Sequence, residues 1–177
     1  GFRIEHHCPD LGGAMQAFRV VRATYYAHFG GPLLVQHRAQ MKDTVIENIE
    51  EGLALSAADV ARADAERTRL YLGLLEFFRD HDFLVTPTTQ VTPFDVETEW
   101  VREIEGQQLH SYLDWMSSCC IFSVFGLPAI SVPCGFTANG LPVGLQIICR
   151  PRADLEVLQA AYAFEQATGY GLRRPAL

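Results

Sequence analysis

The sequence contains no uninterrupted apolar run of about 18 residues, so we expect no membrane-spanning helix. It has no C-x-x-C pair among its five cysteines, which argues against a zinc site and against a disulfide framework. It has no internal repeat and no low-complexity segment. Residues 1–11 lack the apolar core of a secretory signal peptide. We therefore expect a cytoplasmic protein with reduced thiols, and we predict neither a metal nor a cofactor.

The composition is that of a folded domain. The chain has 177 residues, which is the length of one ordinary domain, and 49% of them are hydrophobic. Residues 1–177 are therefore predicted to form a single domain. The formal net charge of −7 argues against nonspecific binding to nucleic acid or to an anionic membrane.

Two apolar segments near the C-terminal end predict a β-hairpin. The strands are expected at Ala129–Phe136 and Pro142–Cys149, with a tight turn at Asn139-Gly140. Asn-Gly is typical of a type I′ turn, which needs two residues with positive φ. Both faces of the first strand are apolar or small, which is typical of a sheet covered on both sides.

Helical periodicity dominates the rest of the chain. Gly30-Gly31-Pro32 is expected to end the first long helix, and Gly52 is expected to end another. Ser56 and Asp59 resemble a capping box that starts the longest helix, and Asp154 is expected to cap the last one. The fold class is α/β, a mixed β-sheet flanked by helices. We predict strands at 2–7 and 83–86, helices at 12–29, 33–40, 42–51, 57–80, 112–122 and 155–168, and a polar, irregular surface segment at 88–111 with room for a short helix.

Several blocks are similar in order and spacing to the amidase signature family. The hairpin block reads GLPAISVPCGF and then GLPVGLQ, a long and nearly ungapped match. PDLGGAMQAFRVVRA, HDFLVTPTTQVTPF and ADLEVLQAAYAFEQATG lie in the family's order on either side. The resemblance runs from about residue 2 to residue 169 and implies the C-terminal part of the amidase signature fold.

The resemblance implies hydrolysis of carboxamides through a Ser-cis-Ser-Lys triad, in which a lysine activates a bridging serine and that serine activates the nucleophile. The family's glycine-rich serine motif is absent here. The one lysine, Lys42, lies beside Asp43 and is expected to be exposed. Ser117-Ser118, the one serine pair, has no flanking glycines to form an oxyanion loop. We therefore predict no catalytic residue in this chain and no amidase turnover by it alone.

The resemblance also implies that this region lines one wall of the acyl pocket. A tryptophan beside a carboxylate offers an apolar face and a hydrogen-bond acceptor for a substrate amide. The alternative is an apolar helix that packs into the core, with one aspartate as its cap. The candidate substrate-binding residues are Asp114, Trp115, Cys119 and Phe122.

Three other patterns have a chemical and a structural interpretation. Cys119-Cys120 is either a redox switch or cysteine nucleophile, or a buried inert pair whose apolar neighbours raise the thiol pKa. His6 and Cys8 would share one side of a strand, but two ligands do not make a metal site. His81-Asp82 is either a general-base pair or a capping or solvent-exposed pair; we favour the structural interpretation in all three patterns.

Three hypotheses remain. In the first, the chain is the C-terminal part of an amidase-signature hydrolase that acts on a small-molecule amide other than a peptide. In the second, it is a noncatalytic module that binds a partner or oligomerises. In the third, it is an independent cysteine enzyme. We expect a homo-oligomer or a complex with a second chain, because a partial sheet leaves strand edges exposed.

Overall fold

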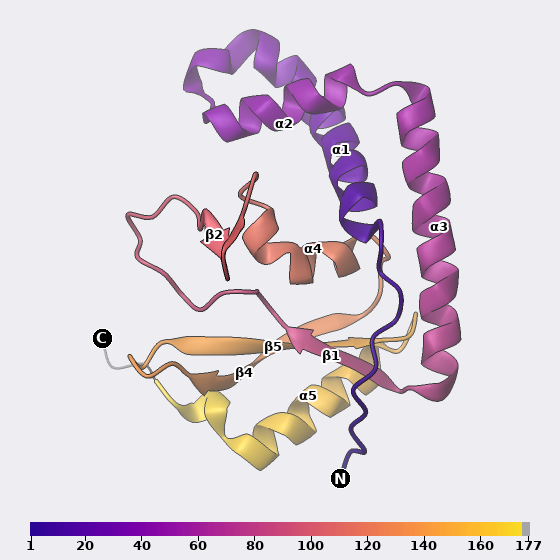
Figure 1. Cartoon of the computed structure of the whole chain (residues 1–177), viewed down its shortest axis with the longest axis vertical. Coiled ribbons are helices and arrows are strands. Elements are labelled where there is room, and N and C mark those ends of the chain that lie inside the picture. The colour runs from indigo at the N-terminus through magenta and orange to yellow at the C-terminus, as the bar shows by residue number, and fades with distance from the viewer. Residues whose placement is uncertain (175–177) are drawn as a thin grey trace. The chain divides into compact units, whose positions relative to one another are not determined.

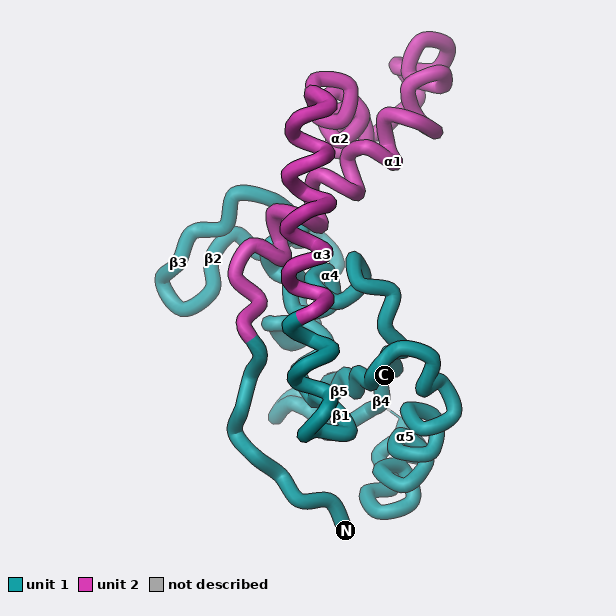
Figure 2. The backbone as a smooth tube through the Cα atoms, turned by 90° about the vertical axis from the view of Figure 1, so that its right-hand side faces the viewer, with its two compact units in different colours: residues 1–9, 73–177 teal, residues 10–72 magenta. Residues whose placement is uncertain are grey.

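The computed structural model describes residues 1–174, and the chain forms two compact units (Figure 2). Unit 1 contains residues 1–9 and the chain from Gly73 onward, and unit 2 contains Asp10–Leu72. Within the described residues, no helix is long and apolar enough to cross a bilayer. In chain order the elements are α1 (Ala14–His37), η1 (Arg38–Gln40), α2 (Asp43–Ala54), α3 (Ala57–Asp80), β1 (Phe83–Pro87), β2 (Glu103–Ile104), β3 (Gln107–Gln108), η2 (Asp114–Met116), α4 (Ser117–Ser123), β4 (Ala129–Phe136), β5 (Pro142–Cys149), α5 (Asp154–Thr168) and η3 (Tyr170–Leu172).

Unit 2 is built on the close pairing of α1 and α2. Three of the four buried residues of α1 are alanine, and such short side chains let the second helix approach the backbone. At Gly30, an added Cβ would lie 2.6 Å from two side-chain carbons of Ile49, which is itself buried. Asn48, also buried, accepts a hydrogen bond from Arg22 and donates one to the carbonyl oxygen of Thr44, so its polar group is satisfied.

The prediction that Gly30-Gly31-Pro32 ends the first helix was wrong. Helix α1 continues through Pro32 to His37. Likewise Gly52 does not end α2, which runs on to Ala54. Gly30 and Gly52 are explained by contact between α1 and α2, since an added side chain at either position would collide with the other helix.

The start of α3 agrees with the predicted capping box. The Ser56 N–H donates to the Asp59 carboxylate at 2.9 Å, and the Asp59 N–H donates to Ser56 Oγ at 3.2 Å. These reciprocal bonds satisfy backbone donors that a helix start leaves unpaired. The hydrogen bonds from Ser56 also hold the pKa of Asp59 below its usual value, with a smaller contribution from Arg62.

Unit 1 contains a three-stranded antiparallel sheet with the order β1-β5-β4 (Figure 1). Helix α5 covers one face of it. Val132 of β4 and Ile147 and Cys149 of β5 pack there against Val157 of α5 and its small neighbours. Strand β5 is the central strand, and its Ile148, on the opposite face, is fully buried. The predicted α/β fold class, a sheet flanked by helices, is confirmed.

The hairpin strands have the predicted bounds, but the turn differs. Gly140 has a positive φ of 78°, whereas Asn139 is not among the residues with positive φ, so the turn is not type I′. Instead Thr137 closes a longer loop: its N–H donates to the carbonyl oxygen of Leu141 at 2.8 Å, and its carbonyl oxygen accepts from the Gly140 N–H at 2.9 Å. Strand β4 also carries a β-bulge between Pro133 and Gly135.

The N-terminal segment and the long polar segment differ from prediction. Residues 2–7 form no strand. The segment 88–111 is irregular, as expected, but it contains the short strands β2 and β3 rather than a helix. The expected helix at 112–122 is divided into η2 and the seven-residue α4.

Helix α5 starts without the predicted cap. Its N-cap residue is Ala153, and Asp154 lies in the first turn and makes no side-chain cap bond. An acidic residue there still interacts favourably with the helix dipole. The helix ends as predicted, because Gly169 adopts φ 64° and its N–H donates to the carbonyl oxygen of Glu165.

Candidate functional site

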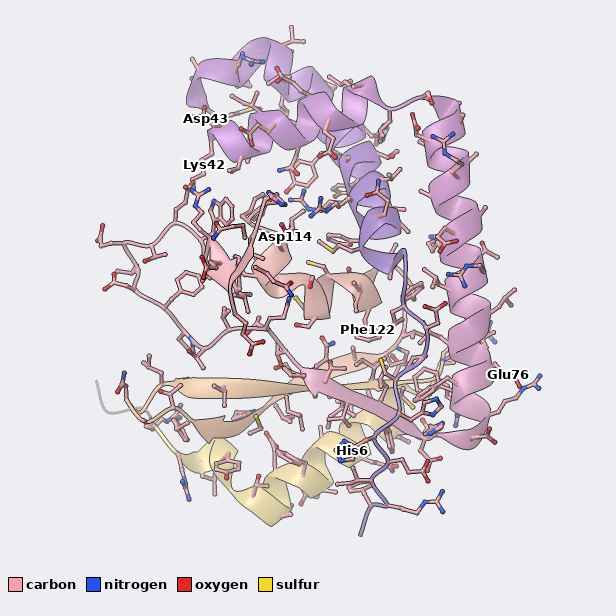
Figure 3. All side chains as sticks on the ribbon, viewed as in Figure 1. His6, Lys42, Asp43, Glu76, Asp114 and Phe122 are labelled. Atoms are coloured by element: carbon pink, nitrogen blue, oxygen red, sulfur yellow. The ribbon has the colours of Figure 1, made fainter. Side chains whose placement is uncertain are left out.

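The predicted substrate-binding residues all lie on the segment formed by η2 and α4, which we call the wall segment (residues 114–123). It belongs to unit 1 and lies on the face of the sheet opposite α5 (Figures 1 and 3). Figure 3 labels Asp114 and Phe122 near its two ends. The segment is anchored by the buried side chains of Leu113, Cys120 and Phe122. Between Leu113 and Cys120, residues 114–119 are all half-buried.

Asp114 stabilises the start of the wall segment. One carboxylate oxygen accepts the backbone N–H groups of His110 and Ser111, both at 2.9 Å. Charge-assisted bonds of this kind are stronger than neutral ones. They fix the turn that leads into η2. The N-cap residue of η2 is Leu113 and no side-chain cap bond is made, so Asp114 is not the predicted helix cap.

Trp115 provides the aromatic surface of the wall segment. Its ring meets the ring of Phe94 edge-to-face, with centroids 5.2 Å apart and planes at 90°. Trp115 is half-buried and Phe94 is 38% exposed. The two rings thus form an apolar surface in contact with solvent. Their edge-to-face arrangement is one that aromatic pairs prefer.

Gln90 holds the wall segment to the chain that follows β1. Its side-chain oxygen accepts from Ser117 Oγ at 2.7 Å and from the Ser118 N–H at 3.2 Å. Its own backbone N–H donates to the carbonyl oxygen of Trp115 at 3.4 Å. Gln90 could not be predicted as part of the site, because a glutamine in a polar irregular segment carries no signal of its partners.

A row of hydroxyl groups continues this connection across the sheet. Ser118 Oγ donates to the carbonyl oxygen of Thr88 at 2.9 Å, and Thr88 Oγ1 shares a hydrogen bond with Ser131 Oγ at 2.7 Å. An added Cβ at Gly144 would lie 2.7 Å from Thr88 Oγ1 and 2.9 Å from Ser131 Oγ. A glycine at this position leaves space for the hydroxyl pair.

Buried Gln146 connects the sheet to α4. Its amide nitrogen lies 3.4 Å from both Thr86 Oγ1 and the carbonyl oxygen of Ser118. Because unpaired buried amides are costly, these contacts fix α4 over the sheet. Ser117 and Ser118 both donate their hydroxyl groups to protein acceptors, the Gln90 side-chain oxygen and the Thr88 carbonyl oxygen.

The two remaining candidates have different environments. Phe122 lies on the buried side of α4 and is 3% exposed, whereas Cys119 is half-buried. A hydrogen bond from the Cys120 side chain lowers the pKa of Cys119 to about 6, outweighing the effect of burial, which raises it. The expectation that apolar neighbours raise the thiol pKa was therefore wrong for Cys119.

The other chemical patterns have structural explanations. Lys42 is exposed at the start of α2, in unit 2 (Figure 3). His81 stacks on Phe77, with centroids 4.1 Å apart, and its Nδ1 lies 3.0 Å from the Phe77 carbonyl oxygen at the end of α3. His7 Nδ1 lies 3.3 Å from His81 Nε2. Among residues 1–174, no group of three or more His, Cys, Asp or Glu side chains is arranged to hold a metal ion.

A cavity of about 560 Å³ lies entirely within unit 2, at the turn between α1 and α2. It is lined by an ion pair between Arg38 and Glu50, 2.6 Å apart, and by Met41 and Ile46. The cavity contains none of the candidate substrate-binding residues.

Comparison with known proteins identifies the family. The Amidase family model matches residues 32–158, well over half of the chain. The chain belongs to the amidase family. An acylamidase of Rhodococcus erythropolis is 38% identical over 140 residues. The A subunit of the glutamyl-tRNA(Gln) amidotransferase of Moorella thermoacetica is 48% identical over 100 residues.

Solved structures agree with this assignment. A crystal structure described as an amidase superposes with a TM-score of 0.82 at 28% identity, covering 90% of this chain. A bacterial aryl acylamidase of the amidase signature family superposes at 0.77 with 25% identity, covering 94%. The chain spans 36% and 37% of those two proteins, 29% of the Rhodococcus acylamidase and 19% of the Moorella protein.

A variant pair tests the role of Gln90. Gln90→Leu removes the acceptor for Ser117 and Ser118 and should cost about 1 kcal/mol, equivalent to roughly fivefold faster hydrogen exchange at the Ser118 amide. Gln90→Glu keeps an acceptor oxygen and should retain slow exchange. Equal exchange in both variants would contradict the role given to the Gln90 side chain.

Proposed function

We propose that this chain is the C-terminal portion of a hydrolase that cleaves non-peptide carbon–nitrogen bonds in small-molecule amides. In this proposal it supplies sheet strands, covering helices and one wall of the substrate pocket. The Ser-cis-Ser-Lys triad would come from elsewhere in the complete enzyme. The chain alone is therefore inactive.

The observation that carries the proposal is the family match over residues 32–158, in a chain that spans 29–37% of the acylamidase and amidase relatives described above. Two of those relatives carry names that describe amide chemistry, acylamidase and aryl acylamidase. Within the chain, the lone lysine is exposed and both hydroxyl groups of the serine pair have structural acceptors. These features support the view that the reactive groups lie outside this sequence.

The wall segment is the proposed contact with substrate. The Trp115–Phe94 pair supplies an apolar surface for an acyl or aryl group, and Cys119 contributes a small half-buried side chain to the same segment. Asp114 positions the start of the segment through its backbone bonds, and Phe122 supports it from below. The expected substrate therefore carries an apolar group next to its amide.

The proposal predicts no hydrolysis of a simple aromatic amide by the 177-residue chain, measured as ammonia or amine release above buffer. In the complete enzyme, Trp115→Ala should raise KM about tenfold, through about 1.4 kcal/mol of lost apolar contact. Trp100→Ala is the matched control, because the Trp100 ring packs against the Arg102 guanidinium and is not part of the wall segment, so this variant should leave KM unchanged. Turnover by the isolated chain that a single substitution within it abolishes would overturn the proposal.

The second candidate function is a noncatalytic module that binds a partner or oligomerises. The observation that favours it is an apolar row on α5: Leu155, Leu158 and Tyr162 are 64%, 55% and 64% exposed. Under either function we expect a homo-oligomer or a complex with a second chain. We expect this assembly in the cytoplasm, bound neither to nucleic acid nor to a membrane. Light scattering at micromolar concentration distinguishes a clean monomer from such an assembly.

A further inference from the structure

The polar segment between β1 and the wall segment is long and is tied down at both ends. Residues 92–109, which we call the loop segment, run outward from the end of β1 and return through β2 and β3 (Figure 1). Just before it, the Gln90 side chain accepts a hydrogen bond from Ser117. Just after it, the His110 N–H donates to the Asp114 carboxylate. Both ends of the loop segment are therefore fixed to the wall segment.

Between these ends the loop segment is bonded to itself. In the part of the chain that the structure describes, its hydrogen bonds and ion pairs all join two of its own residues, as in the pairing of β2 with β3 and the Arg102–Glu99 ion pair at 3.2 Å. Residues 92–99 are all exposed. Few buried contacts are typical of a segment that opens locally at a small cost in free energy. Long loops of this kind in a compact domain are commonly active-site lids or binding loops.

One aromatic contact joins the middle of the loop segment to the wall segment. It is the edge-to-face pair of Phe94 and Trp115, with ring centroids 5.2 Å apart. The other aromatic ring of the loop segment, that of Trp100, lies 3.6 Å from the Arg102 guanidinium, within the same segment. An aromatic pair of this geometry shifts an equilibrium by roughly two- to tenfold. A contact of this size holds a loop in place and still allows it to open.

We propose that the loop segment is a lid over the wall segment, and that Phe94 is the latch that holds the lid closed on Trp115. The inference rests on the proposed function, in which Trp115 contacts an apolar group of the substrate. With the lid closed, an aryl or bulky acyl group that lies against Trp115 also contacts Phe94. Such a group stabilises the closed lid, and the closed lid slows its departure. Opening moves the residues between the two fixed ends and leaves the bonds of Gln90 and Asp114 intact.

Trypsin cleavage of the 177-residue chain after Arg102 tests the latch without any substrate. Arg102 is exposed and is the one lysine or arginine of the loop segment. At low protease concentration the cleavage rate follows the population of the open form. Phe94→Ala should raise this rate about fivefold, whereas Phe94→Tyr keeps the ring and should retain the parent rate. Val96→Ala is the matched control, because Val96 lies in the same segment and is 92% exposed, and it should leave the rate unchanged.

The partner ring provides an independent check. Trp115→Ala should raise cleavage after Arg102 by the same factor as Phe94→Ala, and the double variant should show no further increase, because the two rings form one contact. Circular dichroism shows whether each variant is folded. Equal rates for the parent and folded Phe94→Ala would overturn the latch, and so would two effects that multiply in a folded double variant.

The complete enzyme tests whether the substrate closes the lid. Benzoate, at a concentration that inhibits most benzamide hydrolysis, should slow cleavage after Arg102 about fivefold, whereas acetate, which has no ring, should not. Phe94→Ala should abolish the protection by benzoate. Inhibition by benzoate without protection of Arg102 would overturn closure by the substrate. A complete enzyme that hydrolyses no amide would count against the proposed function, and cleavage of the 177-residue chain would still decide the latch.

Discussion

Replacing Gly52 with alanine is expected to destabilise unit 2 by about 3 kcal/mol, at the upper end of the range for overpacking. In helix α2 an added Cβ would overlap the backbone carbonyl oxygen of Ala23 and lie 2.9 Å from the Cβ of Ala27. Backbone atoms cannot rotate away as side chains can, so α1 and α2 must separate. The better helix propensity of alanine returns only about 1 kcal/mol. Packing therefore determines the sign of the change.

The matched control is Gly73→Ala in α3, where an added Cβ meets nothing within 4 Å. This variant should be more stable than the parent by up to about 1 kcal/mol, from propensity alone. Urea unfolding gives the two free energies, and hydrogen exchange at the amides of α1 and α2 shows where Gly52→Ala acts. Stabilisation by both substitutions would show that α1 and α2 do not approach closely at Gly52.

The hairpin strands could be predicted because their signal is local. Apolar strand residues and flanking turn residues determine β4 and β5, and both have the predicted bounds. The turn could not be predicted from Asn139-Gly140 alone. The bulge in β4 and the Thr137 bonds lengthen the loop, and these depend on the register of the whole hairpin.

Helix boundaries at glycine could not be predicted for a tertiary reason. Glycine and proline inside a helix are locally unfavourable, so Gly30-Gly31-Pro32 and Gly52 predict helix ends. In the structure, Gly30 and Gly52 lie where the two helices of unit 2 approach each other. The packing of α2 against α1 compensates for the local cost, and a single sequence does not show which helix will pair with which.

The wall segment could be located from the sequence, but the bonds that hold it could not. Gln90 is 27 residues from Ser117, and Thr88 is 43 residues from Ser131, so only the fold brings these groups together. The same holds for α5. Helical spacing groups Leu158 and Tyr162 on one side of this helix, but they are 55% and 64% exposed because the sheet packs against the side that contains Val157 and its small neighbours.

Substitution of Ile148 is expected to have the other large effect, on unit 1. Ile148 is fully buried on the central strand β5, where it pairs with Leu84 of β1 and Ala129 of β4. Ile148→Ala shortens the side chain and leaves a cavity that the two neighbouring strands cannot fill. We expect a loss of about 2–5 kcal/mol, measured by urea unfolding, and about 1 kcal/mol for Ile148→Val.

The control is Val85→Ala on β1, a strand that pairs with β5 on one side. Val85 is 51% exposed, so its loss should cost less than about 1 kcal/mol. The expected order of destabilisation is therefore Ile148→Ala, then Ile148→Val, with Val85→Ala no greater than the latter. A cost for Val85→Ala equal to that of Ile148→Ala would mean that β-propensity, rather than burial of the side chain, determines the stability of the sheet.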